Sequence, residues 1–114
     1  MDQQSKKEIL ASYKQRKITG GVYAVRNTVN GRMELFSTAD MTGSKNRYEF
    51  SLQTGVCVSM KLQKDWNIYG SSAFVFEVLE ELTKKETQTE KEYMDDIRTL
   101  KELWREKYDS SMLY

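Results

Sequence analysis

Two strand-like segments on either side of an Asn-Gly pair are the feature that most restricts the fold of this chain. The runs VYAV (22–25) and MELF (33–36) flank Asn30-Gly31. Asn-Gly is the preferred pair for a type I′ turn, because both central residues of that turn need a positive φ. The sequence therefore predicts a β-hairpin over residues 22–37.

The turn type also predicts the register of this hairpin. With a two-residue turn at Asn30-Gly31, counting outward along the strands brings Val25 opposite Phe36. The same count places Tyr23 near Thr38. The ends of the hairpin, and not its tip, are then expected to bring Tyr23 close to the segment 36–40.

A third strand is predicted by the run AFVFEVLE, residues 73–80, in which side chains alternate. Phe74, Phe76 and Val78 are expected on one face, because successive side chains of a strand point to opposite faces. This strand is expected to join the hairpin in one sheet.

Four helices are expected around these strands. The first begins at Ser5, where SKKE can form a capping box, and it ends at Gly20-Gly21. The second covers 42–54, with Met41, Tyr48 and Leu52 on one face and Gly55 after its last turn. A third, short helix follows, with Ser59 as N-cap and Gly70 at its end.

The last helix is expected over about 89–108, where apolar residues recur at helical spacing. The predicted order is α-β-β-α-α-β-α, which is an α+β fold with a three-stranded, mainly antiparallel sheet packed by helices. At 114 residues the chain is expected to form one domain, 1–114, with its core over about 13–108 and a short tail at 109–114.

Composition excludes several kinds of chemistry. The chain has no histidine and a single cysteine, Cys57, so it contains neither an intramolecular disulfide nor a His- or Cys-rich zinc site. Catalysis would therefore depend on Tyr, Lys, Arg, Asp, Glu or Ser. No secretory leader and no membrane-spanning run is recognisable, so we expect a cytoplasmic protein that is not in a membrane.

Charge is unevenly distributed along the chain. Residues 1–76 hold 11 Lys and Arg against 6 Asp and Glu, a net charge of +5, and residues 77–114 hold 7 against 11, a net charge of −4. The front part is the one that can attract phosphate groups. Its candidate nucleic-acid-binding residues are Lys14, Arg16, Lys17, Lys45, Arg47, Lys61 and Lys64.

The segment LQKDWNIYGSSAFVFEVLEEL (62–82), together with GVY (21–23) and the hairpin that contains Asn-Gly, carries a family resemblance. Over roughly residues 13–108 the chain resembles the GIY-YIG nuclease superfamily, and within it the small single-domain proteins of bacteria and their phages. Members of this superfamily cut DNA with hairpin tyrosines, a helix arginine that steadies the phosphate and a glutamate that holds Mg²⁺.

The resemblance assigns roles residue by residue, and several of the family's residues are replaced. Tyr23 matches the tyrosine of the first motif. The tyrosine of the second motif falls on Glu34 and its glycine on Phe36, whereas the helix arginine falls on Ser44. The remaining positions that match these motifs are Gly21, Val22 and Leu35.

Two further positions follow from the resemblance. An aromatic residue or histidine one turn beyond the helix arginine falls on Tyr48, and the Mg²⁺ glutamate falls near Lys101-Glu102. A carboxylate at Glu34 would face and repel the phosphate, a ring at Phe36 would fill space that glycine leaves open, and Ser44 cannot replace a guanidinium. Lys45 and Arg47 are expected to point about 100° or more away from Ser44 around the helix.

These replacements imply a catalytically degenerate domain that binds a partner and does not cut. We expect a protein partner, with DNA as the other candidate, no cofactor, and a regulatory role as an inhibitor or adaptor in a phage or mobile element. The candidate residues for a protein interface are Phe36, Met112, Leu113 and Tyr114.

An active, Mg²⁺-dependent endonuclease with a rearranged site is the alternative. Its catalytic residues would be Tyr23, Tyr48, Arg47 and Glu102, with Glu102 as the metal ligand. Glu34 would then serve as an extra oxygen ligand, which suits a hard cation.

Overall fold

The computed structural model describes residues 18–114. The helix predicted from Ser5 and the cations Lys14, Arg16 and Lys17 lie outside these residues. In chain order the elements are β1 (Thr19–Asn27), β2 (Met33–Thr38), α2 (Met41–Thr54), α3 (Met60–Tyr69), η1 (Ser71–Ala73), β3 (Phe74–Thr83), α4 (Glu90–Glu106) and η2 (Ser110–Met112). The predicted order of strands and longer helices is confirmed over this part of the chain.

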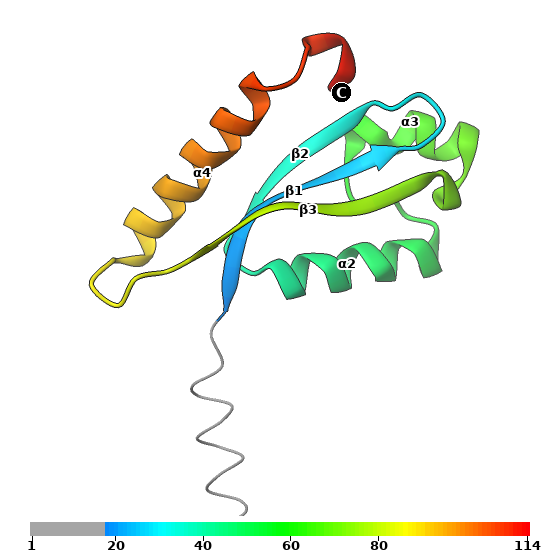
Figure 1. The fold of residues 1–114 in the computed structure, drawn as a ribbon. Helices are drawn as coiled ribbons and strands as arrows, with labels where there is room; N and C mark the ends of the chain where they lie inside the picture. Colours follow the sequence, from blue (N-terminus) through cyan, green and yellow to red (C-terminus); the bar gives the residue numbers. More distant parts are fainter. Residues whose placement is uncertain (1–17) are drawn as a thin grey trace, which may run out of the picture.

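The three strands form one antiparallel sheet in the order β2-β1-β3. Figure 1 shows α2 and α3 on one side of the sheet and α4 on the other. This arrangement is the α+β fold that the sequence predicts. None of the helices within residues 18–114 combines the length and the apolar character that crossing a bilayer requires.

The central strand β1 separates two apolar clusters because its side chains alternate between the faces of the sheet. On the α2–α3 side, Val25 packs in one cluster with Leu62 and Trp66 of α3. On the α4 side, Ala24 packs with Leu35 in a second cluster, against which Trp104 of α4 lies. Tyr23 therefore belongs to the face that α2 and α3 cover.

The predicted hairpin exists, but its predicted register is wrong by two residues. Tyr23 lies opposite Phe36 and Val25 opposite Glu34. The connection is longer than two residues, because the amide of Asn27 donates to the carbonyl of Arg32 at 2.8 Å.

The reason for the longer connection lies in the side chains of the turn. Among the described residues only glycines have a positive φ, so Asn30 does not adopt the conformation that a type I′ turn requires. Instead its side chain accepts a hydrogen bond from the Arg32 amide at 2.9 Å, and that of Asn27 accepts one from the Val29 amide at 2.9 Å. Such short-range side-chain bonds favour an Asx turn over a two-residue hairpin loop.

Helix α2 ends where the sequence predicts and begins one residue earlier, at Met41. Asp40 caps its first turn by accepting a hydrogen bond from the Gly43 amide at 3.0 Å, and Gly55 follows its last turn with φ of 77°. The prediction that Leu52 lies on the buried face is wrong, since it is 39% exposed. Ser44 and Ser51 are buried instead, because small hydroxyl side chains that satisfy their own hydrogen bonds allow a close approach to the sheet.

Strand β3 extends three residues beyond the predicted end, and its alternation is only partly as expected. Phe74 is buried and Phe76 packs against the same cluster, but Val78 is 47% exposed. The pairing with β1 shifts between Val22 and Tyr23, and Val78 borders an open groove beside the first turn of α2. The predicted burial of Val78 is therefore wrong.

The C-terminal residues pack on the domain. The amide of Tyr114 donates to the carbonyl of Met33 at 2.9 Å, which extends the edge of β2. The Tyr114 hydroxyl donates to Asp65 at 2.6 Å and accepts from Asn27 at 3.1 Å. Tyr114 thus joins the hairpin turn to α3, so the structure gives it and the half-buried Leu113 an intramolecular role.

Tyr93 of α4 connects the ends of the strands. Its side chain is 2% exposed, and its hydroxyl accepts a hydrogen bond from the Gly20 amide at 2.7 Å while donating to the carbonyl of Leu82. Gly20 leaves room for this contact, because a Cβ atom there would collide with the hydroxyl and with the backbone of Thr38. One phenol therefore holds α4 against β1 and β3.

We expect Tyr93→Phe to lower the free energy of unfolding by about 1–3 kcal/mol, because it leaves a buried amide and a carbonyl without their partner. Urea unfolding followed by circular dichroism measures this loss. Tyr69→Phe, which removes the hydroxyl of an exposed ring, is the matched control and should change the midpoint little. Equal stabilities of the two variants would contradict the proposed role of the Tyr93 hydroxyl.

Candidate functional site

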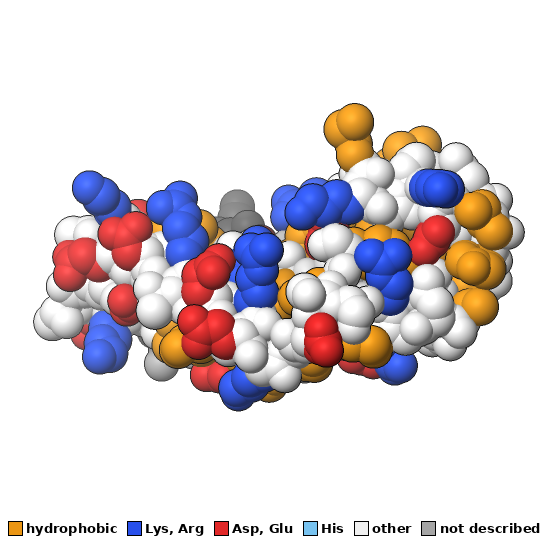
Figure 2. Space-filling view, turned by 90° about the horizontal axis from the view of Figure 1, so that it is seen from above, with side chains coloured by type: hydrophobic (Ala, Val, Ile, Leu, Met, Phe, Trp, Pro, Cys, Tyr) orange, Lys and Arg blue, Asp and Glu red, His pale blue; other side chains and the backbone are white. Residues whose placement is uncertain are grey.

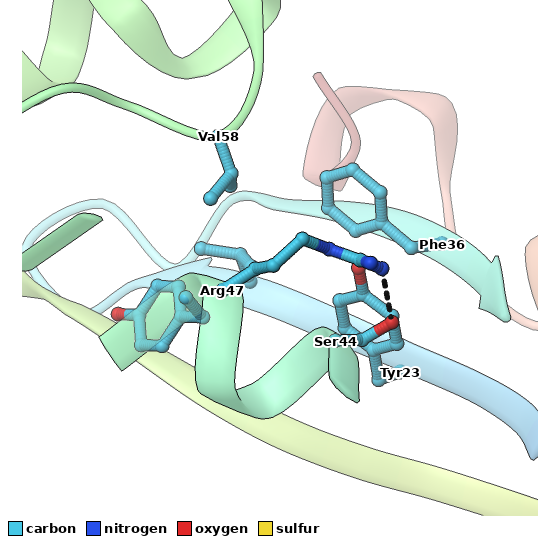
Figure 3. A pocket seen from close by; sticks show the side chains of 7 residues that line it. Tyr23, Phe36, Ser44, Arg47 and Val58 are labelled. Atoms are coloured by element: carbon cyan, nitrogen blue, oxygen red, sulfur yellow. Dashed lines mark hydrogen bonds between the residues drawn. The ribbon is translucent and has the colours of Figure 1, made fainter. Parts of the chain in front are cut away.

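A cavity of about 290 Å³ lies between the sheet and α2, on the face that Tyr23 occupies. Two hairpin strands, helix α2 and the loop before α3 line it, with the side chains of Tyr23, Val25, Phe36, Ser44, Arg47, Tyr48 and Val58 (Figure 3). The structure thus brings together most of the residues on the α2–α3 face that the sequence singled out. Val58 and Val25 were not predicted, because neither carries a reactive group.

A chain of hydrogen bonds fixes Arg47 at this cavity. Its Nη2 donates to the Ser44 hydroxyl at 3.0 Å, and Ser44 donates to the Thr38 hydroxyl at 2.7 Å. Thr38 in turn donates to the carbonyl of Asp40 at 3.0 Å, where α2 is capped. Ser44 and Thr38 are both buried, whereas Arg47 is exposed at the mouth.

The expectation that Arg47 points about 100° or more away from Ser44 is wrong. Residues three apart in an α-helix are neighbours on one face, because each turn takes 3.6 residues. Figure 3 shows Arg47 folded back over Ser44 and next to Tyr23. The three-residue spacing of Ser44 and Arg47 in the sequence is enough to predict that their side chains are neighbours on α2.

Three aromatic rings form a stack on the sheet beside Arg47. Tyr23 of β1 stacks on Phe36 of β2, with ring centres 5.0 Å apart and planes 10° apart. On its other side Tyr23 stacks on Phe76 of β3, with ring centres 4.5 Å apart and planes 22° apart. We call these three residues the aromatic column; each strand of the sheet contributes one ring to it.

No model of a known protein family and no curated protein matches the chain. Among solved structures, the catalytic domain of the homing endonuclease I-TevI matches with a TM-score of 0.58 and 26% identity, over 77% of this chain and 86% of that domain. The chain has the fold of a GIY-YIG nuclease domain. A mutant of the I-TevI catalytic domain, described as an intron endonuclease, also matches, with 26% identity over 73% of this chain and 84% of that one and a TM-score of 0.47.

Within this GIY-YIG fold, Glu34 does not line the cavity of Tyr23. Its carboxylate accepts a hydrogen bond from the Ser59 hydroxyl at 2.9 Å, and its second oxygen is buried without a partner among residues 18–114. It borders a smaller cavity at the outer edge of β2, together with Lys61, Lys101 and Arg105. Its charge still acts on the neighbouring cavity, because, besides burial, it is one of the causes that raise the pKa of Tyr23.

The small cavity at the β2 edge gathers cations from two helices. Lys61 comes from α3, and Lys101 and Arg105 come from α4. Figure 2 shows Lys and Arg side chains distributed along this view of the molecule, with Asp and Glu side chains between them. The sequence did not predict this grouping, because the residues lie far apart along the chain.

Glu102 is separate from the Tyr23 cavity. It is exposed on α4, which packs on the opposite face of the sheet. The structure therefore does not bring Glu102 together with Tyr23, Tyr48 and Arg47, although the resemblance placed a metal ligand near it.

The residues that line the Tyr23 cavity do not fit Mg²⁺. Within residues 18–114 no carboxylate borders this cavity, and its polar groups are three hydroxyls and a guanidinium. A hard divalent cation selects carboxylate and carbonyl oxygens, and the Arg47 charge repels it. The same part of the chain contains no cluster of three or more Asp, Glu, Cys or His residues able to hold a metal ion.

The remaining sequence-predicted residues are dispersed. Gly21, Val22 and Leu35 are buried in the strands, and Gly21, with φ of 145°, lies against the backbone of Glu80. Lys45 borders the groove beside the first turn of α2, and Lys64 is exposed on α3. Met112 is 39% exposed beside the packed Leu113 and Tyr114.

Both tyrosines of the cavity are held in their neutral form. Burial raises the pKa of Tyr48 from its ordinary value to about 12. Burial also raises the pKa of Tyr23, and the Ser44 hydrogen bond and the Arg47 charge offset only part of that rise. A general base works best with a pKa near the working pH, so neither phenol is suited to that role near neutral pH.

The pKa of Tyr48 predicts a loss of stability in alkali. The unfolded phenol ionises near pH 10 and the folded one only at about 12, so the stabilisation is complete below pH 10 and is lost as pH rises from 10 to 12. Urea unfolding at a series of pH values should show a shallower alkaline loss in Tyr48→Phe than in the wild type. An unchanged slope in this variant would contradict the raised pKa, and Tyr69→Phe is the control.

Proposed function

We propose that this GIY-YIG-fold domain binds nucleic acid through a backbone phosphate at the Tyr23 cavity and does not cut it. The observation that carries the proposal is the composition of the cavity. It joins the Arg47 guanidinium to the Ser44 hydroxyl and two neutral phenols, and no carboxylate of residues 18–114 borders it. Such a domain would serve as a regulatory or adaptor protein.

Arg47 has the properties of a phosphate ligand. Its exposed guanidinium offers five N–H donors, and the bond to Ser44 uses one of them. No second hydrogen bond of this group is made within residues 18–114, and the side chain is exposed. Charge-assisted, bidentate contacts to phosphate are the strongest hydrogen bonds that arginine makes.

Hydrolysis of a phosphodiester needs groups that this cavity does not supply. A metal ion would lower the pKa of an attacking water, but the lining residues do not fit one. The neutral phenols cannot take its proton near neutral pH, because their pKa values are raised. Phe36 also occupies space that glycine leaves open at the matching position of the family motif.

An Mg²⁺-dependent endonuclease remains the second candidate, and one observation favours it. Tyr23, which the resemblance assigns to the first motif, and Arg47, which the rearranged site would use, border the same cavity. A nuclease of this kind would need its metal ligands from groups that move or from the nucleic acid itself.

A protein is the other kind of partner, and exposed hydrophobic residues away from the cavity favour it. Figure 2 shows hydrophobic side chains at the end of the molecule that carries the hairpin turn and α3. Val29, Ile68 and Tyr69 are 61%, 61% and 42% exposed in these elements. A host protein retained from lysate after nuclease treatment would favour this occupant, whereas loss of the captured material would favour nucleic acid.

We expect Arg47→Ala to weaken binding of labelled DNA about tenfold or more, because a charge-assisted contact contributes about 1.5–3 kcal/mol. Binding should fall steeply with salt in the wild type and less steeply in the variant. Fluorescence anisotropy measures both quantities. Lys91→Ala, which removes an exposed cation at the start of α4, is the matched control and should have a smaller effect.

The same DNA should stay intact with Mg²⁺ or Mn²⁺ on a denaturing gel. Metal-dependent cutting that increases with protein and disappears in Tyr23→Phe would overturn the proposal in favour of the endonuclease. Binding that neither salt nor Arg47→Ala alters would contradict the phosphate contact.

A further inference from the structure

We propose that the cavity takes one unpaired nucleotide of a single strand, with its phosphate at Arg47 and its base stacked on Phe36. This inference rests on the proposed function and specifies its ligand. It predicts that single-stranded nucleic acid is bound in preference to duplex.

The aromatic column ends at an open position of the sheet. Its rings follow one another from Phe76 on β3 through Tyr23 on β1 to Phe36 on β2. β2 is the edge of the three-stranded sheet, and within residues 18–114 the C-terminal residues pair with it at Met33 and not at Phe36. Phe36 is half-buried, with one ring face against Tyr23, and the column can be extended by one more planar group.

A nucleobase is the planar group that matches these surroundings. Phe36 and Arg47 border the same cavity, so a stacking face and a phosphate ligand lie within the reach of one nucleotide (Figure 3). Val58 borders the same cavity on the same side of Arg47 as Phe36 and adds apolar surface to it (Figure 3). Proteins that bind single strands combine these same two elements, aromatic faces for bases and cations for the backbone.

The size of the cavity and the state of the bases both favour a single strand. About 290 Å³ lies just below the volumes of small-ligand pockets, which start at roughly 300 Å³, so the cavity is too small for a stack of several bases. In a duplex the base faces are already stacked, so a base reaches Phe36 only after it is unpaired and flipped out. An unpaired strand avoids that cost.

Charges of both signs surround Phe36. Besides the larger effect of burial, the Glu34 charge reaches the Tyr23 phenol, where the Arg47 charge opposes its effect on the pKa. The Glu34 carboxylate accepts a hydrogen bond from Ser59, and the cations Lys61, Lys101 and Arg105 share its cavity, which lowers its repulsion of a phosphate at Arg47. These cations lie at the same edge of the sheet as Phe36 and extend the surface that a strand can follow.

The test compares three labelled ligands by fluorescence anisotropy: a short oligothymidylate, a duplex of equal length and an abasic single strand of equal length. The full chain is used as wild type, Phe36→Leu, Phe36→Tyr and Phe50→Leu. Leucine removes the ring and keeps an apolar side chain, tyrosine keeps the ring, and Phe50 is an exposed ring of α2 that does not border the cavity. Thermal unfolding confirms that each variant is folded.

We expect the wild type to bind oligothymidylate more tightly than the duplex and the abasic strand. Phe36→Leu should weaken oligothymidylate binding about five- to one-hundred-fold, the range measured for loss of one base–aromatic stack, and leave the abasic strand unaffected. Phe36→Tyr, which keeps the ring, should bind oligothymidylate about as tightly as the wild type. Phe50→Leu should also have the affinity of the wild type.

Two other results would overturn the inference and distinguish its failure from that of the proposed function. One result is equal binding of single strand and duplex that Phe36→Leu does not change but Arg47→Ala weakens. It would contradict the base stacked on Phe36 and leave the proposed phosphate contact at Arg47 standing. Binding of none of the three ligands would overturn the proposed function as well.

Discussion

The hydrogen bond between the hydroxyls of Ser44 and Thr38 determines how the site is built, because it fixes α2 on the sheet. Both side chains are buried, and their small size allows the helix to approach the end of the hairpin closely. Ser44 also receives Arg47, so the contact that docks the helix is the one that orients the guanidinium. The Ser44 hydroxyl therefore affects both how closely α2 approaches the sheet and where the Arg47 guanidinium lies at the cavity.

Much of the fold could be predicted from the sequence, because the signals for element boundaries are local. Asp40 and Gly55 bound α2, Ser59 and Gly70 bound α3, and Thr89 begins α4 with a capping box. Each of these residues acts on hydrogen bonds within its own turn. The structure therefore agrees closely with the predicted order of elements.

The errors have different physical causes, some local and one distant in the sequence. The Asn-Gly pair predicted a two-residue turn, but the side chains of Asn27 and Asn30 bind backbone amides and lengthen the loop. Burial of Leu52 followed from an apolar pattern, whereas the helix buries Ser44 and Ser51 because hydroxyl groups can be satisfied locally. The placement of Glu34 depends on Ser59, 25 residues away, and no local pattern contains that contact.

The central strand isolates the cavity from α4. Side chains of β1 that point to α2 and α3 form one cluster, and those that point to α4 form another, so each side of the sheet is anchored separately. The two sides still meet at the outer edge of β2, where Lys61 of α3 and Lys101 and Arg105 of α4 border one cavity. A ligand that passes around this edge would contact both layers of helices, although each layer is anchored to the sheet by its own apolar cluster.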